Sequence, residues 1–304
     1  MPDNAPFAYE VEDLNKQYGD DSKPANANVS FRIRQGEFFG LLGSNGAGKT
    51  TLIKQMIGLV RPDSGTVRLL GRDVFTHPRF TTANVGYMPQ TAFALNSLTV
   101  REAVYFSAHL RGVAAKAAKR ERDDLLEQLG LTHLTNKVAR QLSGGERRLL
   151  QIAVTLTGSP PVLILDEPTN ELDPSRRRQV WQLFKDLNQR DGRTIILITH
   201  NAIEAEQVIE RVGILKNGRL VALGAPAELK SSLRSQVRLS ITLEDTQLHR
   251  LPDYVHVQSQ HRGKVVALVD SADLPHLTKD VDLTQFPEFT MHTATLEDVY
   301  VSYA

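Results

Sequence analysis

The sequence has 304 residues, of which 41% are hydrophobic and 23% are charged, as expected of a globular protein long enough to bury its own core. It contains no cysteine, which excludes disulfides and thiolate metal sites and fits a reducing compartment. Lys and Arg number 36 against 35 Asp and Glu, and the net charge of +1 excludes the basic field of a dedicated nucleic-acid-binding protein.

Membrane signals are absent from the sequence pattern. No apolar run approaches the roughly 20 residues that cross a bilayer. Met1–Glu10 lacks the basic start and the apolar stretch of a signal peptide. We therefore expect any action on a membrane to pass through another chain.

The first predicted elements follow the strand–loop–helix order of a βαβ unit. Val29–Ile33 alternates apolar and polar residues like a half-buried strand, and Phe38–Leu42 is a wholly apolar strand. A glycine-rich loop comes next, and Thr51–Ile53 then begins a helix. Gly65–Val74 is predicted as short strands.

The pattern becomes helical from about Leu98 to Gly130. Thr99 and Glu102 have the spacing of a capping box, which predicts the start of a helix. We expect a helical subdomain inserted at about residues 91–150.

The α/β pattern then returns and continues to a strong hairpin turn. Val162–Leu165 and Thr194–Ile198 are predicted as buried strands, and Asp173 followed by proline predicts the start of a helix between them. Asn217–Gly218 is typical of a hairpin turn.

Short strands dominate the chain after about Leu229. Arg238–Leu243 and Lys264–Asp270 are the clearest of them. We expect residues 1–229 to form one domain and residues 230–304 to form a small α+β C-terminal domain.

The loop after the first apolar strand fits G-x-x-x-x-G-K-[ST] at every fixed position. Its residues are Gly43, Ser44, Asn45, Gly46, Ala47, Gly48, Lys49 and Thr50. Backbone N–H groups approach a polyphosphate most closely where there is no Cβ atom, and the positive end of the next helix favours an anion. Lys49 is suited to reach the β- and γ-phosphates, and the Thr50 hydroxyl is suited to bind Mg²⁺. The loop therefore predicts a nucleotide site.

Two adjacent acids end the strand Val162–Leu165, at the sheet edge where ligands bind in α/β proteins. Neighbouring residues of an extended chain point in opposite directions, so the two acids are free to act differently. Asp166 is suited to Mg²⁺ and Glu167 to a general base that activates water. The alternative is that both acids only cap a helix after a core strand.

A second glycine pair occurs in Gln141–Glu146. Gly144 and Gly145 follow Ser143 and open a helix, which makes a second anion-binding helix N-terminus. Two phosphate sites in one chain predict either two nucleotides or one nucleotide shared between two chains. Physical reasoning alone leaves both open.

Taken together, these motifs resemble those of the ABC ATPase family. In order they are Tyr18, the loop at 43–50, Gln90, LSGGE at 142–146, LILDEPT at 163–169, LDP at 172–174 and His200. The resemblance implies a P-loop NTPase (RecA-like) core with an antiparallel β subdomain and the inserted helical subdomain. It also implies a head-to-tail dimer, in which Ser143–Glu146 of one chain completes the ATP site on the phosphate loop of the other.

The resemblance also implies individual roles. Tyr18 would stack on adenine, Gln90 would contact Mg²⁺ and water, and His200 would contact the γ-phosphate. Alternatives that the residues leave open are an ordinary strand-end tyrosine for Tyr18 and a helix cap for Asp173. The implied catalytic residues are Glu167, His200 and Gln90, the implied metal ligands are Thr50, Gln90 and Asp166, and the implied nucleotide-binding residues are Tyr18, Gly43, Ser44, Asn45, Gly46, Ala47, Gly48, Lys49, Thr50, Thr51, Ser143, Gly144, Gly145, Glu146 and Asp173.

Three positions depart from the common pattern of the family. Glu171 stands where a small residue usually precedes Leu-Asp-Pro, Glu146 replaces the commoner Gln, and Asn201 follows His200 where Asp is common. None of these removes a catalytic group, so we expect ATP hydrolysis.

Gly218–Gly224 and Leu296–Tyr300 resemble segments of exporter ATPases that pair with ABC-2-type membrane subunits. The resemblance implies an ATP-hydrolysing transporter subunit that requires ATP and Mg²⁺, binds no nucleic acid and works as a homodimer or with a paired ATPase. We expect it at the cytoplasmic face of a bacterial inner membrane, attached to an integral membrane permease. The alternative is a non-transport ABC ATPase in DNA maintenance or translation. The sequence does not indicate the cargo.

Overall fold

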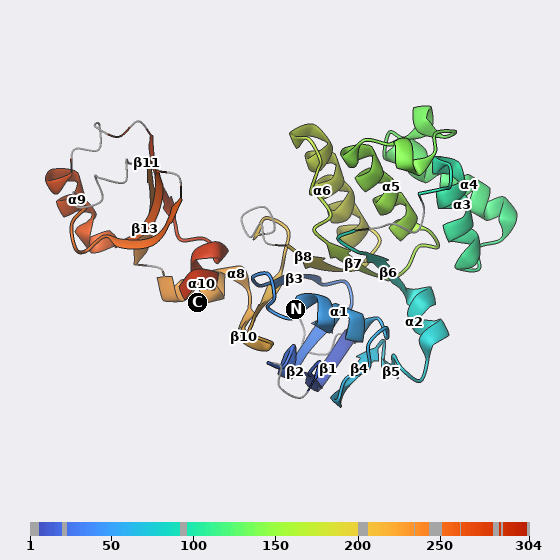
Figure 1. Cartoon of the computed structure of the whole chain (residues 1–304), viewed down its shortest axis with the longest axis horizontal. Coiled ribbons are helices and arrows are strands. Elements are labelled where there is room, and N and C mark those ends of the chain that lie inside the picture. Colours follow the sequence, from blue (N-terminus) through green and yellow to red (C-terminus); the bar gives the residue numbers. More distant parts are fainter. Residues whose placement is uncertain are drawn as a thin grey trace. The chain divides into compact units, whose positions relative to one another are not determined.

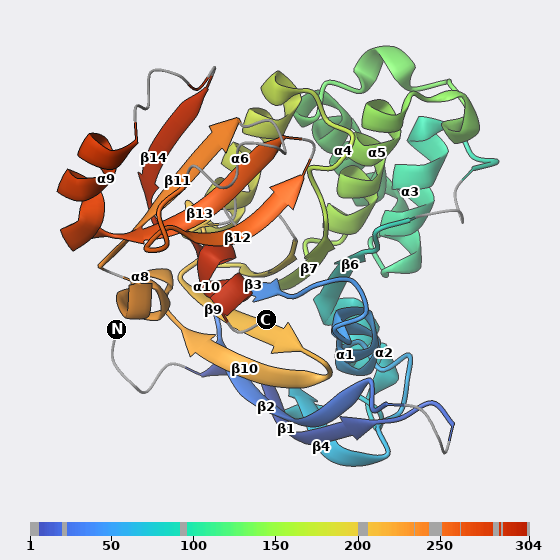
Figure 2. The same cartoon turned by 60° about the vertical axis from the view of Figure 1, so that its left-hand side comes forward.

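The computed structural model describes residues 6–19, 23–91, 96–199, 206–233, 235–242, 251–261, 263–281, 286 and 288–302. The chain divides into two compact units. The first consists of Met1–His200 with Val208–Val221, and the second of Asn201–Gln207 with Ala222–Ala304. The expected boundary after Leu229 lies inside the second unit. Figures 1 and 2 show the elements of each unit.

A mainly parallel sheet forms the centre of the first unit, with strand order β10-β9-β3-β8-β7-β6. Its strands are β3 (Phe38–Leu42), β6 (Val85–Met88), β7 (Val162–Asp166), β8 (Thr194–Ile198), β9 (Arg211–Lys216) and β10 (Arg219–Gly224). Every residue of β3 and β8 is buried, as their apolar sequences predict. Asn217 and Gly218 both have positive φ between β9 and β10, which confirms the predicted hairpin turn.

An antiparallel sheet with order β2-β1-β4-β5 lies below the first sheet in Figure 1. Its strands are β1 (Phe7–Lys16), β2 (Asn26–Arg34), β4 (Ser64–Leu69) and β5 (Arg72–Asp73). Helix α1 (Lys49–Met56) lies between the two sheets in both views. Its Leu52, Ile53 and Met56 belong to one buried core with residues of both sheets, so the helix that follows the phosphate loop is fixed on two sides.

The remaining helices of the first unit are α2 (Pro78–Asn84), α3 (Val100–Leu110), α4 (Ala115–Gln128), α5 (Gly144–Leu156) and α6 (Pro174–Gln189). Helices α5 and α6 lie on the side of the parallel sheet opposite α1 (Figures 1 and 2). Thr99 and Glu102 form the predicted capping box of α3, and Asp173 caps α6. None of the helices in the described ranges has the length and apolar character that a membrane span requires.

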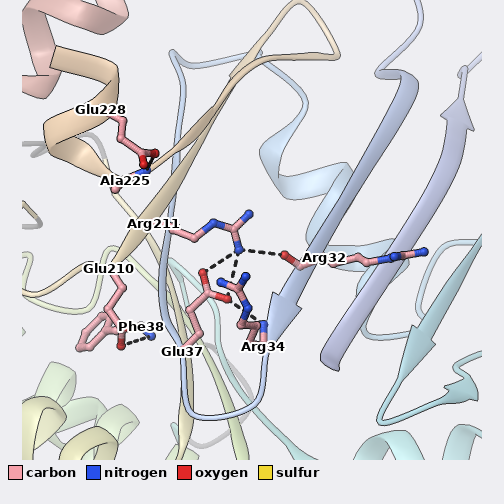
Figure 3. A network of polar contacts seen from close by, with 8 residues as sticks. All are labelled: Arg32, Arg34, Glu37, Phe38, Glu210, Arg211, Ala225 and Glu228. Carbon is pink, nitrogen blue, oxygen red and sulfur yellow. Dashed lines mark hydrogen bonds and ion pairs between the residues drawn. The ribbon is translucent and has the colours of Figure 1, made fainter. Parts of the chain in front are cut away.

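A buried ion pair fixes the start of β3 (Figure 3). Glu37 is only 4% exposed, and its carboxylate accepts hydrogen bonds from Arg211 Nη1 at 3.0 and 3.3 Å and from the Arg34 N–H at 2.7 Å. Arg211 Nη1 also donates to the Arg32 carbonyl at 3.3 Å, and the Phe38 N–H donates to Glu210. These contacts join β2, β3 and β9 at the end of β3 that lies away from the phosphate loop.

The second unit contains a four-stranded antiparallel sheet with order β12-β13-β11-β14 (Figure 2). Its elements are α8 (Pro226–Leu229), β11 (Gln236–Thr242), β12 (His256–His261), β13 (Lys264–Asp270), α9 (Leu274–Asp280), β14 (Phe289–Thr293) and α10 (Leu296–Ser302). Leu277 of α9 packs with Leu239 and Val265 in a separate hydrophobic core. The predicted strand at Lys264–Asp270 is confirmed; the other begins two residues earlier than predicted, and Leu243 lies outside the described residues. The α+β class is confirmed.

The terminal motif Leu296–Tyr300 forms most of α10 and is tied into the second unit. Asp298 is 1% exposed; its carboxylate accepts hydrogen bonds from the Thr295 N–H and hydroxyl, each at 2.8 Å, and pairs with Arg238 of β11. Glu206 pairs with Lys230, and the Leu296 N–H donates to Glu206 at 3.4 Å.

Candidate functional site

The phosphate loop connects β3 to α1 and is held by its own backbone and by the β9–β10 turn. The Ala47 N–H donates to the Ser44 carbonyl at 3.1 Å, and the Gly218 N–H donates to the Ala47 carbonyl at 2.9 Å. Lys49 Nζ donates to the Gly43 and Ser44 carbonyls at 2.6 and 2.9 Å, which holds the ammonium over the loop. The loop is therefore a shaped cradle with a positive charge above it.

Two of its glycines are required by the protein's own backbone. A Cβ atom on Gly43 would lie 2.5 Å from the Leu215 carbonyl oxygen, and one on Gly48 would collide with the Ala25 carbonyl. Gly48 also has φ of +102°, a conformation that other residues rarely adopt. Gly46, with φ of +80°, has no neighbour within 4 Å of an added Cβ, so at this position the reason for glycine is its backbone conformation.

A pocket of about 280 Å³ opens over the cradle. It is lined by Tyr18, Ala25, Ser44, Asn45, Gly46, Ala47, Gly48, Lys49, Thr50, Thr51, Gln90, Asp166 and Glu167. The structure thus brings together the predicted adenine-stacking, phosphate-binding, metal-binding and general-base residues. Tyr18 is 52% exposed at the rim, and Lys16 Nζ lies 5.6 Å from its ring centroid.

The two acids at the end of β7 and directly after it lie in different environments. Asp166 lines the pocket as the last residue of the strand, whereas Glu167 has a positive φ of 50° and is only 7% exposed. The Glu167 N–H donates to the Ile198 carbonyl at 2.8 Å, and Thr199 Oγ1 donates to Glu167 Oε2 at 3.0 Å. The residues at the end of β8 therefore orient the Glu167 carboxylate. The different surroundings of Asp166 and Glu167 fit the prediction that the two acids have different functions.

Burial controls the charge states in the pocket. It raises the pKa of Asp166 to about 6; the adjacent Glu167 adds to this, while Lys49 and Arg148 oppose it. Burial also lowers the pKa of Lys49, against the attraction of the two acids. The site therefore favours a ligand that brings both phosphate charge for Lys49 and a cation for Asp166.

The second glycine pair begins α5 outside this pocket. Ser143 Oγ accepts from the Glu146 N–H at 3.3 Å, and Glu146 Oε2 accepts from the Ser143 N–H at 2.8 Å. This reciprocal pair lowers the pKa of Glu146. The Glu at position 146 therefore completes a capping box, and the Ser143, Gly144, Gly145 and Glu146 motif does not line the pocket of its own chain.

Two other predicted site residues, Gly43 and Asp173, are not among the residues that line the pocket. Asp173 accepts hydrogen bonds from the Ser175 and Arg176 N–H groups at 3.0 Å each, which is the helix-cap alternative. His200 lies outside the described residues, as does Asn201.

Two residues near the acids were not predicted. One is Thr199, the partner of Glu167. The other is Arg148, a 5% exposed arginine on α5 whose guanidinium donates to the Asp166 carbonyl at 2.7 Å. Arg148 stands four residues before the buried Ile152 and so lies on the apolar face of the helix, which was the available signal.

Residues 26–170 match the family model described as ABC transporter. Among curated proteins, the chain is 38% identical over 231 residues to human phospholipid-transporting ATPase ABCA7, a match that covers 76% of this chain and 11% of the relative. It is 35% identical over 240 residues to human ATP-binding cassette sub-family A member 2, covering 79% of this chain and 10% of the relative. The chain thus spans about a tenth of the length of these relatives.

Solved structures give matches over nearly their whole length. One is cbiO1 from Clostridium perfringens, part of the ABC transporter complex cbiONQ, with 30% identity and a TM-score of 0.66 over 74% of this chain and 91% of that one. Another is the dimeric post-hydrolysis state of the ATP-binding cassette MJ0796 bound to ADP and Pi, with 25% identity and a TM-score of 0.67 over 71% and 98%.

Proposed function

This chain belongs to the ABC transporter family of ATP-binding domains, and from that premise we propose that it binds ATP over its phosphate loop and hydrolyses it. The observation that carries the proposal is the pocket itself. It joins a glycine cradle, the Lys49 ammonium and two acids with different surroundings.

The pocket fits Mg²⁺ bound together with the phosphates. The described residues include no group of three or more His, Cys, Asp or Glu side chains that could hold a metal unaided, so the phosphates would supply part of the coordination. Thr50, Asp166 and Gln90 line the pocket and would hold the ion directly or through water. Mg²⁺, when bound, would neutralise phosphate charge and keep Asp166 ionised.

Glu167 is the proposed general base. Its carboxylate would accept a proton from water while the water oxygen forms a bond to the γ-phosphorus, and the bond from that phosphorus to the ADP oxygen breaks. Lys49 would stabilise the negative charge on the phosphates, Tyr18 would stack on adenine and His200 would contact the γ-phosphate. The hydrogen bond from Thr199 supports the role of Glu167 because it fixes the carboxylate.

We further propose that two copies share each ATP. The Ser143–Glu146 motif does not line the pocket of its own chain, so a second chain would have to supply it. Dimers of a related cassette, MJ0796, support this arrangement. Asp173 would lie near the seam of the dimer.

The proposed work of the dimer is transport, with export favoured, through a separate membrane permease at the cytoplasmic face. The related cbiO1 is described as part of a transporter complex, and ABCA7 as a phospholipid-transporting ATPase, which supports a transport role here. ATP binding would close the dimer and hydrolysis would reopen it, because only the closed state binds ATP from both sides. Residues 230–304 are proposed as an accessory domain.

Two measurements test the proposal. Purified protein should hydrolyse Mg·ATP, and Lys49→Ala should lose most of that activity. A tagged chain extracted from its native membranes in mild detergent should bring down a polytopic membrane protein in stoichiometric amount. An active ATPase recovered only with ribosomes or DNA would refute the transport role, and a wild-type protein without turnover would refute the hydrolytic role.

A further inference from the structure

We propose that Arg148 is a positioning residue for ATP hydrolysis, which holds the backbone that carries both acids and Gln90 in register with α5. The inference rests on the proposed function of the pocket but concerns a residue that lies outside its lining. Arg148 would act through Glu167 and Gln90, since its guanidinium contacts their main chain.

The hydrogen bonds of Arg148 use the full donor capacity of a guanidinium, which is five N–H groups. Nη2 donates to the carbonyls of Asp166, at 2.7 Å, and of Glu167. Nε donates to the Pro168 carbonyl at 3.3 Å. Nη1 donates to the Gln90 carbonyl at 3.0 Å and to Gln151 Oε1 at 2.8 Å. Four of the five acceptors are backbone oxygens, one in the segment that carries Gln90 and three in the segment from Asp166 to Pro168.

These acceptors belong to parts of the chain that are far apart in sequence. Gln90 follows β6, the run from Asp166 to Pro168 follows β7, and Arg148 itself lies in the second turn of α5. A shift of α5 would therefore be passed directly to the peptide units that carry Glu167 and Gln90.

The choice of arginine follows from the geometry. A lysine ammonium has three donors and a compact charge, so it could not satisfy carbonyls spread around a planar fork. The Glu167 peptide also needs support, because its φ of 50° is unfavourable for a residue with a side chain. The hydrogen bonds from Arg148 to the carbonyls of Asp166 and Glu167, which precede and follow the Cα atom of Glu167, hold this conformation in place.

The Ser143–Glu146 motif forms the start of α5, the helix that also carries Arg148. Gly144 and Gly145 form the first turn of α5, and Arg148 follows in the next turn. When a second chain's ATP contacts that first turn, as the proposed dimer requires, the movement of the helix reaches Glu167 of the same chain through Arg148. The residue thus links occupation of one site to the geometry of the other.

The test compares Arg148→Met and Arg148→Lys with the matched control Arg111→Met. Arg111 is also a partly buried arginine of the first unit, and its Nη1 donates to the Val85 carbonyl at 3.1 Å, away from the pocket. We expect Arg148→Met to lower kcat about 100-fold with KM for ATP changed less than about twofold, because a small misplacement of a catalytic group costs about that much. Arg148→Lys should retain nucleotide binding and lose most of kcat as well.

Amide hydrogen exchange of the nucleotide-free proteins gives a readout independent of turnover. Arg148→Met should increase exchange in residues 89–91 and 167–171, whereas Arg111→Met should leave both segments unchanged. Equal kcat losses in the two methionine variants, or unchanged exchange near Glu167, would overturn the inference. A wild-type protein without ATPase activity would refute the proposed function, and the exchange data would still decide whether Arg148 positions these segments.

Discussion

The carboxylate of Glu171 lies directly over the backbone of Gly144, so close that Oε2 occupies the space a Cβ atom on this glycine would need. Gly144 begins α5, where the positive end of the helix dipole attracts anions. Glu171 therefore places a negative charge at the position where, in the proposed dimer, the phosphates of the second chain's ATP would bind. It also has φ of +66°, so its backbone is held in an unfavourable conformation.

From this contact we expect Glu171→Gln to strengthen ATP-dependent dimerisation. Removing one like charge near a phosphate is worth about 1 kcal/mol at a wet interface. The symmetric dimer loses one such charge at each of its two ATP sites, so we expect about 2 kcal/mol, or roughly a 30-fold lower dimer dissociation constant. The measurement is sedimentation of the Glu171→Gln and Glu171→Ala variants in a Glu167→Gln background with Mg·ATP. Weaker dimers in both variants would mean that Glu171 contributes an attractive contact instead.

A second prediction concerns Thr199, whose hydroxyl donates to Glu167 at 3.0 Å. Thr199→Val keeps the shape of the side chain but removes this bond, and we expect kcat to fall about tenfold with little change in ATP binding. Thr199→Ser should retain most activity. Thr194→Val is the matched control at the opposite end of β8, where Thr194 Oγ1 accepts a hydrogen bond from the Gly36 N–H. Equal effects of the two valine variants would contradict an orienting role.

A third prediction follows from the pKa of Asp166, raised by burial to about 6 from an ordinary value of 3.8. Between these values the folded state binds more protons than the unfolded state, so the contribution to stability is complete below about 3.8 and is lost as the pH rises through about 6. In EDTA, Asp166→Asn should therefore be as stable as wild type near pH 4 and more stable near pH 7. Urea denaturation of both proteins between pH 4 and pH 7 measures the two free energies of unfolding. A difference between them that does not change with pH would contradict the prediction.

A fourth prediction concerns the buried pair of Glu37 and Arg211. Glu37→Gln leaves a partly buried guanidinium without its counter-charge, and we expect the free energy of unfolding to fall by about 3 kcal/mol. Glu12→Gln is the control, because Glu12 pairs with Arg32 on the surface and should change stability by less than about 1 kcal/mol. Comparable decreases in the free energy of unfolding of the two variants would show that burial does not determine how much an ion pair stabilises this protein.

The elements predicted from sequence are those with a clean local signal. The apolar runs of β3, β7 and β8, the capping box at Thr99 and the turn at Asn217 all carry such signals. β1 was not predicted, because irregularities in its pairing with β2 interrupt the alternation of buried and exposed residues. One of these irregularities lies between Val11 and Leu14, where Asp13 has φ of 47°. β14 was missed because it has no buried face that would impose a period.

The candidate site was predictable where one short segment carries the chemistry, as in the phosphate loop and the two acids. Arg148 and Thr199 were missed because their partners lie elsewhere in the chain. Arg148 meets Gln90 across 58 residues, and Thr199 meets Glu167 across 32. Such pairs depend on the packing of α5 and β8 against β7, which no local pattern expresses.

Glu206 limits how the C-terminal region can be dissected. Its carboxylate accepts from Lys230 and from the Leu296 N–H, so a short segment between β8 and β9 is bonded to chain that lies far downstream. Truncation after Leu229 would remove both donors and leave the Glu206 carboxylate without them, only six residues after His200 in the sequence. Lost turnover in such a truncated protein would not by itself assign a regulatory role to residues 230–304. Asp298→Asn, which weakens the anchoring of α10 while leaving the chain intact, is the cleaner perturbation.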